Sequence, residues 1–433
     1  MLRTIDLRGR ELSAAELLAA VPRAVVARDL ALTTAAQIVH DVATDGEIAL
    51  RDQAERFDGV VGHDVRVPEA HLDEALAGLD PVVRGALEEA IARVRSASAA
   101  QVPEPSTTFL GPGARVTQRW QPVRRVGVYV PGGKAVYPSS VVMNVVPAQV
   151  AGVDVVALAS PPQRDADGRV HPVILAAARL LGVSEVYAMG GAGAIGAFAH
   201  GVDSIGLDPV DVVTGPGNNF VAAAKRAVAG VVGTDAEAGA TEILVVADDT
   251  ADPALVAADL ISQAEHDEQA SAVLVTPSPA LAAAVAAEIE RRAPRTRHAE
   301  RVAAALAGPQ SAIVLVDDLA RATAFSNAYA PEHLELHLAE PRADEFVNAG
   351  AVFVGASSPV SLGDYLAGSN HVLPTGGQAR YASGLSASTF LRPQQIIEYD
   401  RDALAAVRAD IVALAEAEAL PAHGEAVEAR FEA

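Results

Sequence analysis

Apolar and polar positions follow two different patterns along this chain. From about Leu12 to Ala100 the sequence reads as helices, interrupted by polar breaks at Asp58-Gly59 and Asp80-Pro81. Beyond this region, short strand-like apolar runs alternate with alanine-rich helical stretches. The runs occupy residues 126–130, 153–158, 185–189 and 210–213, and then 242–247, 272–276, 311–316 and 352–354. This alternation predicts an α/β fold built on parallel, doubly wound sheets.

The pattern divides the chain into two Rossmann-like units with additional helical segments at both ends. We expect an N-terminal helical segment over 1–25 and a larger α/β domain over 26–125 and 240–385. A smaller α/β domain is expected over 126–239, and a C-terminal tail over 386–433. Within the tail, the residues from about Gln394 to Arg430 read as a strand followed by an amphipathic helix.

Composition narrows the class of protein without changing this fold. The chain has 433 residues, half of them hydrophobic and 4% aromatic, which suits alanine-rich helices packed on sheets of β-branched strands. Its formal charge of -22 opposes binding to nucleic acid or to an anionic membrane. A dinucleotide is not excluded, because glycine-lined backbone and helix N-termini attract phosphate locally. The N-terminal residues have no signal-peptide pattern, and we expect a cytoplasmic protein.

Glycine-rich turns follow several of the expected strands. The segment 191–196, Gly-Ala-Gly-Ala-Ile-Gly, has the GxGxxG spacing of a dinucleotide-binding loop, and Asp211 lies near the spacing expected of a ribose-binding carboxylate. Two further loops are Pro-Gly-Gly-Lys at 131–134 and Gly-Pro-Gly-Asn at 215–218. Each loop alone is equally well explained as a tight turn. Together they predict a nucleotide cleft at the carboxyl edge of one sheet.

Histidine, carboxylate and amide side chains form a candidate metal site in the second half of the chain. Gln263 and His266 are three residues apart in a helical context, so both side chains can face one point. Asp364 could add an oxygen ligand, and His423 a nitrogen ligand. Sequence spacing does not bring these four residues together, and each histidine taken singly is equally explained as a surface residue.

The adjacent Glu332 and His333 stand at the entrance of an alternating stretch that predicts a strand. An imidazole titrates near neutral pH, so His333 is a candidate general base. His333, Glu335 and His337 would share one face of this strand. That face is either a rival metal site or the solvent-exposed side of a half-covered strand.

As a set, these motifs resemble those of the histidinol dehydrogenases, over almost the whole chain. The segments that carry the resemblance are VGVYVPGGKAVYPSS at 126–140, GGAGAIGAFA at 190–199, TGPGNNFVAAAK at 214–225, SQAEHD at 262–267, APEHLEL at 330–336, GDYLAGSNHVLPTGG at 363–377 and the residues 418–423. The resemblance implies oxidation of L-histidinol through L-histidinal to L-histidine with two NAD+, and one zinc ion per active site. It also implies a domain-swapped homodimer, in which the tail of each chain completes the partner's active site.

The same resemblance assigns roles to individual residues. The implied zinc ligands are Gln263, His266, Asp364 and His423. Glu332 and His333 would carry the acid–base chemistry. The implied substrate contacts are Thr241, His371 and Glu418, together with the zinc ligands and His333. The implied NAD contacts are Tyr129, Asn218 and the residue at position 193.

Two positions depart from the pattern of the family. Where these enzymes usually have GGAQAI, with a glutamine that contacts NAD, this chain has Gly193, which cannot form a side-chain hydrogen bond. Where a Pro-Ser pair is common, this chain has Ala240-Thr241, and Thr241 keeps the hydroxyl group.

The chain contains no cysteine, and this shapes the expected mechanism. Oxidation of an aldehyde requires a tetrahedral adduct, which a thiolate cannot form here, so water must add to give a gem-diol. We expect Glu332 to activate this water and His333 to serve as the base in the hydride-transfer steps. We expect zinc to position the substrate.

Three alternative functions explain these motifs less completely. A related dehydrogenase of another polar primary alcohol would be expected to lack His371 or Glu418, and both are present. A zinc hydrolase would leave the glycine loops without a role. A non-catalytic binding protein would leave the Glu332-His333 pair without one.

Overall fold

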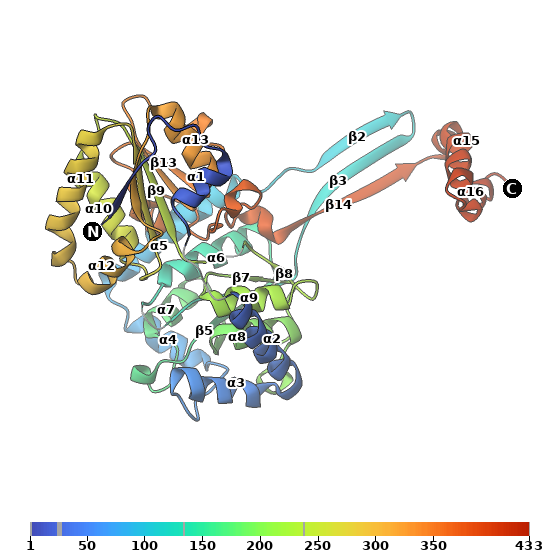
Figure 1. Ribbon diagram of the computed structural model, residues 1–433. Helices are drawn as coiled ribbons and strands as arrows, with labels where there is room; N and C mark the ends of the chain where they lie inside the picture. Colours follow the sequence, from blue (N-terminus) through green and yellow to red (C-terminus); the bar gives the residue numbers. More distant parts are fainter. Residues whose placement is uncertain (1, 24–27, 133–134, 237–238, 433) are drawn as a thin grey trace. The chain divides into compact units, whose positions relative to one another are not determined.

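The computed structural model describes residues 2–23, 28–132, 135–236 and 239–432. These residues form two compact units. The main unit comprises residues 1–101 and 123–390, and the arm comprises residues 102–122 and 391–433. Each unit is described separately (Figure 1). Among the described helices, none is both long and apolar enough to cross a membrane.

The first sheet of the main unit has six parallel strands among the described residues. In spatial order they are β1 (Arg3–Asp6), β11 (Ala312–Leu315), β10 (Ser271–Thr276), β9 (Glu242–Ala247), β12 (His333–His337) and β13 (Ala351–Val354). The central strands β9, β10 and β12 are buried along their full length. Helices therefore cover both faces, which explains why these strands read as nearly continuous apolar runs.

Two layers of helices cover this first sheet. On one face lie α10 (Pro253–Ala264), α11 (Pro279–Arg292) and α12 (Ala299–Ala307), together with the start of α14 (Val360–Tyr365). On the other face lie α1 (Ala14–Ala20) and α13 (Leu319–Tyr329). Successive residues of β9 point alternately into the two layers, with Ile243 and Val245 on the α10 side and Leu244 and Val246 on the α13 side.

The second sheet of the main unit is also parallel. Its strands, in spatial order, are β6 (Glu185–Ala188), β5 (Val155–Ser160), β4 (Arg125–Tyr129), β7 (Val212–Thr214) and β8 (Gly233–Thr234). One hydrophobic core joins this sheet to α2 (Arg28–Asp45), α3 (Glu47–Gln53), α8 (Gly191–His200) and α9 (Asn219–Ala227). The remaining helices, α6 (Pro138–Ala151), α7 (Pro172–Leu180), α4 (Glu69–Ala77) and α5 (Pro81–Ala99), pack against one another.

Capping residues in the sequence explain where several helices begin. Asp80 caps α5 by accepting hydrogen bonds from two backbone N–H groups, and Pro81 occupies the first helical position. Asp252 and Ser278 cap α10 and α11 in the same way, each followed by a proline. The polar break expected at Asp80-Pro81 is thus the start of a helix.

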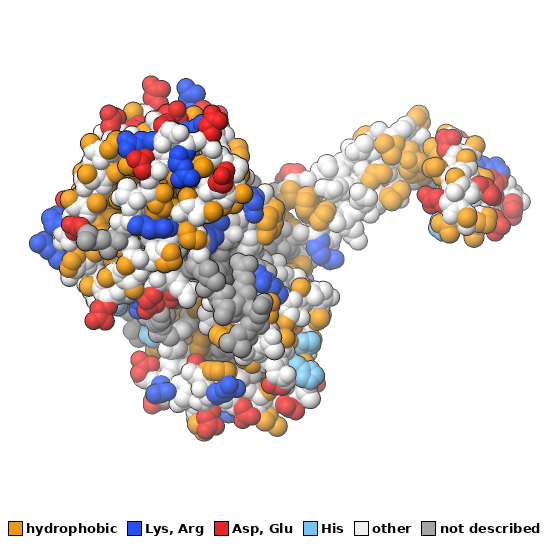
Figure 2. Space-filling view, viewed as in Figure 1, with side chains coloured by type: hydrophobic (Ala, Val, Ile, Leu, Met, Phe, Trp, Pro, Cys, Tyr) orange, Lys and Arg blue, Asp and Glu red, His pale blue; other side chains and the backbone are white. Residues whose placement is uncertain are grey.

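The arm is a three-stranded antiparallel sheet followed by two helices. The strand order is β14 (Leu391–Tyr399), β3 (Ala114–Pro122) and β2 (Ser106–Gly111), and the helices are α15 (Arg401–Ala417) and α16 (Pro421–Glu428). Large apolar side chains of the arm are exposed: Phe109, Leu110, Ile397 and Leu414. Figure 2 shows such side chains along the strands of the arm.

The α/β fold with parallel sheets expected from the sequence is confirmed, as are the eight strand runs and the strand and helices of the tail. Four strands, β1, β2, β3 and the two-residue β8, were not expected. A further difference concerns α2 and α3, which the sequence analysis assigned to the larger domain. Their buried residues, including Ala35, Val39 and Leu50, pack into the core of the second sheet.

Candidate active site

The candidate catalytic residues lie at the amino edge of the first sheet. His333 is the first residue of β12, and Glu242 is the first residue of the neighbouring strand β9. Before His333 the chain turns sharply out of α13 through Ala330, whose φ of 49° is left-handed, and Pro331. This turn places Glu332 directly before the strand, as the sequence analysis predicted.

The backbone of Glu242 contacts both members of the candidate catalytic pair. Its N–H donates to Oε2 of Glu332 at 2.9 Å, and its carbonyl oxygen lies 3.1 Å from Nδ1 of His333. Both side chains are buried. Burial raises the pKa of Glu332, although the nearby His333 and the hydrogen bonds from Thr241 and Glu242 oppose the shift. A raised pKa suits a carboxyl group that exchanges protons near neutral pH.

Thr241 connects Glu332 to the candidate metal ligand Gln263. The Thr241 hydroxyl donates to Oε2 of Glu332 at 2.5 Å and accepts from Nε2 of Gln263 at 2.6 Å. The other amide atom of Gln263, Oε1, is buried and has no hydrogen-bond partner among the described residues. A buried amide oxygen without a donor is an unsatisfied acceptor, which a cation can satisfy.

A third group of candidates gathers around His371. Its Nδ1 lies 2.9 Å from the carbonyl oxygen of Asp364, and its Nε2 lies 3.1 Å from Oγ of Ser140. Burial lowers the pKa of His371. The charge of Asp364 opposes this shift, whereas His333 and His266 reinforce it. These electrostatic interactions place Asp364, His266 and His333 in one neighbourhood.

Ser140 belongs to α6, which follows strand β4 of the second sheet. Its contact with His371 therefore connects the carboxyl side of the second sheet with the amino edge of the first. A substrate held beside His333 can thus meet groups from both sheets.

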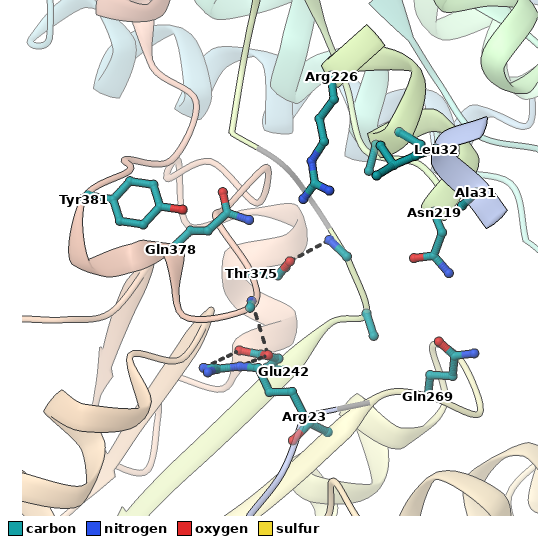
Figure 3. A pocket seen from close by; sticks show the side chains of 16 residues that line it. Arg23, Ala31, Leu32, Asn219, Arg226, Glu242, Gln269, Thr375, Gln378 and Tyr381 are labelled. Carbon is teal, nitrogen blue, oxygen red and sulfur yellow. Dashed lines mark hydrogen bonds and ion pairs between the residues drawn. The ribbon is translucent and has the colours of Figure 1, made fainter. Parts of the chain in front are cut away.

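Arg23 and Glu242 form a second polar cluster next to the catalytic pair (Figure 3). The guanidinium of Arg23 forms an ion pair with the Glu242 carboxylate at 2.6 Å, donates to the carbonyl oxygen of Tyr329 and lies over the Tyr329 ring. Glu242 also accepts from the backbone N–H of Gly376 at 3.3 Å. The cluster borders a pocket of about 220 Å³, which Thr375 also lines. The cluster holds the side chain of Glu242 in place, and the backbone of Glu242 contacts Glu332 and His333.

The proposed metal ligands are brought together only in part. Gln263 lies in the last turn of α10, which ends at Ala264, so His266 follows the helix rather than lying on it. His266 is exposed and Asp364 is half-buried. His423 lies in α16 of the arm, where it is exposed, as is Glu418 at the end of α15.

Among the described residues, one group of three His, Asp or Glu residues has ligand atoms within 4.8 Å of one another. It consists of Asp259, Glu335 and His337. The sequence analysis named Glu335 and His337 as part of a rival metal site or of a solvent-exposed face. The solvent-exposed alternative is wrong, because all residues of β12 are buried. Asp259 was not singled out, since its partners lie far from it in sequence.

The candidate dinucleotide loops lie after strands of the second sheet. Gly191 opens α8 after β6, and its N–H donates to the hydroxyl oxygen of Tyr129 at 3.1 Å. Tyr129 is buried, and burial raises its pKa to about 12. Asn218 is exposed and caps α9 by accepting from Phe220 N–H and Val221 N–H. Both residues thus shape the loops that were expected to hold NAD.

The loop at 215–218 rests on a buried ion pair. Lys225 and Asp235 pair with each other, Lys225 donates to the carbonyl oxygen of Gly215 at 2.6 Å, and Asp235 accepts from the Gly215 N–H at 2.8 Å. Gly215 has a φ of 116°, and a Cβ there would lie 1.9 Å from the carbonyl oxygen of Tyr129. Glycine is therefore required at this position. In the loop at 131–134, Gly133 and Lys134 lie outside the described residues.

The side chain of Gln53 occupies the space beside Gly193. An added Cβ at Gly193 would lie 2.0 Å from Oε1 of Gln53, the last residue of α3. The π-helical turn Ala54–Asp58 follows Gln53 directly. Gln53 was not expected at this site, because nothing in its local sequence relates it to position 193.

The interpretation of Asp211 as a ribose ligand is wrong. Its carboxylate accepts hydrogen bonds from the backbone N–H groups of Arg124 and Arg125, at 2.8 and 3.0 Å, where β4 begins. Asp211 precedes β7, so it lies at the amino edge of the second sheet. The glycine loops lie at the opposite, carboxyl edge of this sheet.

Comparisons with known proteins agree with the fold and with the set of motifs. The family model for histidinol dehydrogenase matches residues 22–431. The chain is 65% identical to a histidinol dehydrogenase of Leifsonia xyli subsp. xyli, covering 100% of this chain and 99% of the relative. It is 59% identical to a histidinol dehydrogenase of Mycobacterium tuberculosis, covering 100% and 98%.

A solved structure supports the same assignment. The crystal structure of a histidinol dehydrogenase from Elizabethkingia anophelis superposes with a TM-score of 0.91 at 32% identity, covering 100% of this chain and 98% of that one. The chain belongs to the histidinol dehydrogenases, the oxidoreductases of the final steps of histidine biosynthesis.

Proposed function

We propose that this chain oxidises L-histidinol to L-histidine through L-histidinal with two NAD+, and that Glu332 and His333 carry the proton transfers. The observation that carries this proposal is the pair of contacts from the Glu242 backbone. One contact reaches each side chain, and both lie in a buried position at the amino edge of the first sheet. Such fixed positioning is what general acid–base catalysis requires.

The contact to Glu242 sets the protonation of the His333 ring. A carbonyl oxygen can only accept, so Nδ1 of His333 carries the hydrogen atom and the lone pair lies on Nε2. Nε2 is then the atom that takes the alcohol proton in the first oxidation and the gem-diol proton in the second. When bound, NAD would supply the hydride acceptor for each oxidation.

Glu332 is the group that activates water for the second oxidation. Its Oε2 accepts hydrogen bonds from Thr241 and from the Glu242 N–H, and burial raises its pKa, which makes the carboxylate a stronger proton acceptor. Because the chain has no cysteine, the aldehyde adduct is a gem-diol rather than a thiohemiacetal. Glu332 would take the proton of the water that adds to the aldehyde.

Zinc is the metal that fits the donor set. The unsatisfied Oε1 of Gln263, the Asp364 carboxylate and the His266 and His423 imidazoles supply oxygen and nitrogen ligands, which zinc accepts. When bound, zinc would hold the imidazole and amine of the substrate beside His333. Thr241 fixes the Gln263 amide so that its oxygen is the free atom. His371 and the substrate groups of the arm, Glu418 and His423, complete the proposed site.

NAD would bind along the carboxyl edge of the second sheet, near Tyr129, Gly193 and Asn218. The N–H groups and left-handed glycines of these loops allow close approach of phosphate. The proposed NAD-binding domain is 126–239, as drawn from the sequence, with α2 and α3 added because they pack into its core. A cytoplasmic location stays a prediction of the sequence.

We also propose that two chains form a domain-swapped homodimer with shared sites. The arm exposes Phe109, Leu110, Ile397 and Leu414, and a small sheet with exposed apolar faces is unstable without a partner. A second copy of this chain would cover these side chains. It would also supply His423 and Glu418, which are exposed in the single chain, to the partner's site.

One assay tests the proposed activity. NADH formed from a limiting amount of histidinol is measured by absorbance before and after zinc removal by a chelator. We expect two NADH per histidinol, loss of activity on chelation and recovery on adding zinc. One NADH per histidinol would contradict the second oxidation, and activity unchanged by complete metal removal would contradict the role of zinc.

A further inference from the structure

A buried cluster of three ionisable side chains lies behind the candidate active site. Glu335 and His337 follow His333 on the face of β12 that packs against α10, and Asp259 reaches them from α10. Glu335 is 1% exposed and His337 6% exposed. We call these residues, Asp259, Glu335 and His337, the rear triad. The proposed reaction uses none of them.

The rear triad contacts three separate elements. Oε1 of Glu335 accepts the backbone N–H of Val360 at 2.8 Å, at the start of α14. Oε2 of Glu335 lies 3.4 Å from Nε2 of His337, which lies 3.7 Å from Oδ2 of Asp259. A carboxylate oxygen of Asp259 lies within 4.8 Å of one of Glu335. The cluster thus connects β12, α14 and α10.

Each of these elements carries a candidate site residue close to its point of attachment. On α10, Asp259 lies one turn before Gln263. On α14, Val360 lies one turn before Asp364. On β12, Glu335 lies two residues after His333 and on the same face. Two proposed zinc ligands and the proposed base are therefore attached, through their own backbones, to one buried cluster.

We propose that the rear triad positions α10, α14 and β12 relative to one another, and so sets the separation of Gln263, Asp364 and His333. This inference rests on the proposed function of those three residues. Asp259, Glu335 and His337 are positioning residues, because none of them is a proposed contact of substrate, zinc or NAD.

The short helix α14 depends most on this arrangement. It has six residues, too few to be stable without tertiary contacts. Its N-cap position is Pro359, whose side chain offers no acceptor for the first N–H groups. Glu335 supplies that acceptor from another strand, and a carboxylate there also interacts favourably with the positive end of the helix.

The surroundings of the rear triad raise the pKa values of Asp259 and His337. Burial and the charge of Glu335 raise the pKa of Asp259 to about 7, so this carboxyl is partly protonated near neutral pH. The pKa of His337 is raised, because its hydrogen bond and charge interactions with Glu335 outweigh the lowering by burial, which is the largest single contribution.

The test compares zinc retention in Glu335→Leu, Glu335→Gln and a control variant, using the full-length dimeric enzyme. The control is Val285→Ala, which removes buried apolar volume from α11 on the same face of the sheet. This substitution leaves the polar contacts between β12, α14 and α10 unchanged. Zinc transfer to a chromogenic chelator is followed at a temperature at which every variant is folded, and thermal unfolding is recorded separately.

We expect Glu335→Leu to lose zinc at least about tenfold faster than the wild type, with a raised KM for histidinol. Glu335→Gln keeps an acceptor for the Val360 N–H and should recover most of the zinc retention. Val285→Ala should lower the unfolding temperature and leave the rate of zinc loss unchanged.

Two results would overturn the proposal. One is zinc loss from Glu335→Leu no faster than from Val285→Ala at matched destabilisation. The other is a second equivalent of zinc per chain that disappears in Asp259→Asn, since the rear triad would then itself be a metal site. The wild type in the same experiment separates the two proposals. If the wild-type enzyme binds no zinc, the proposed function is contradicted. If the wild-type enzyme binds zinc and Glu335→Leu retains it equally well, only the positioning role is contradicted.

Discussion

Nδ1 of His333 lies 3.1 Å from the carbonyl oxygen of Glu242, the first residue of the neighbouring strand β9. The same residue donates its N–H to Glu332. A single peptide segment at a sheet edge therefore orients both candidate catalytic groups, and it does so through backbone atoms that remain when the Glu242 side chain is replaced by that of any residue except proline.

The catalytic pair should separate into two roles when each member is replaced. His333→Asn should slow the oxidation of both histidinol and histidinal, because Nε2 serves as base in each. Glu332→Gln should mainly slow histidinal oxidation, by on the order of a hundredfold or more, because only that step needs activated water. Rates with each substrate supplied separately give the comparison. Equal and mild effects on both substrates would refute the assignment.

The Arg23–Glu242 ion pair should contribute strongly to stability. Arg23→Met leaves the Glu242 carboxylate buried and without its cation, which should cost about 3–5 kcal/mol of unfolding free energy. The double replacement Arg23→Met with Glu242→Met removes both charges and should recover much of that loss. Denaturant unfolding of the four proteins measures the coupling. If the double variant is as unstable as the sum of the single ones, the pair does not act as a unit.

Position 193 should accept glutamine best when Gln53 is shortened. A Cβ at Gly193 would meet Oε1 of Gln53 at 2.0 Å, so the Gln53 side chain must shift in Gly193→Gln, and this variant alone should improve the KM for NAD less than the paired replacement does. The double variant Gly193→Gln with Gln53→Ala should lower the KM for NAD several-fold, which is the effect expected of about one additional hydrogen bond. Gln53→Ala alone is the control. An improvement of the same size in Gly193→Gln alone would mean that Gln53 moves aside freely.

Asp58 should make the unfolding temperature depend on pH. Burial raises the pKa of Asp58 to about 6 from an unfolded value of 3.8, so between these values the folded state holds a proton that the unfolded state has released. This contribution to stability is complete below about pH 4 and is lost as the pH rises through 6. Relative to the wild type, Asp58→Asn should therefore gain stability between pH 4 and pH 6.5 and change little above that. A difference that is flat over this range would contradict the raised pKa.

The swapped dimer predicts complementation between two inactive chains. His333→Asn and His423→Ala chains are mixed unfolded and refolded together. If the arm completes the partner's site, half of the dimers are mixed, and each has one intact site and one with both lesions. About a quarter of wild-type activity should return. No recovered activity, with both chains shown to refold and dimerise, would place each arm on its own chain.

The sequence determined the fold class and the approximate positions of the buried strands. Strand runs such as 242–247 and 272–276 are recognisable because strands buried on both faces must be apolar throughout, and this signal is local. Local chemistry also predicted the polar break at Asp80-Pro81, where a cap and a proline begin α5. The adjacency of Glu332 and His333 required no folding to detect.

Tertiary structure decided the features that depend on contacts between distant segments. The strands β1 and β2 have no continuous apolar pattern, because β1 is an edge strand and β2 is exposed along its length, so their local sequence did not reveal them. Asp211 has nearly the spacing of a ribose ligand but lies at the amino edge of its sheet, because sequence spacing does not say at which end of a strand a carboxylate lies. Gln53 beside Gly193, Arg23 beside Glu242 and Asp259 beside Glu335 are each separated by many residues. Their proximity is fixed only when helices and sheets pack, since hydrogen bonds and ion pairs between side chains depend on distance in space and leave no periodic signal in the chain.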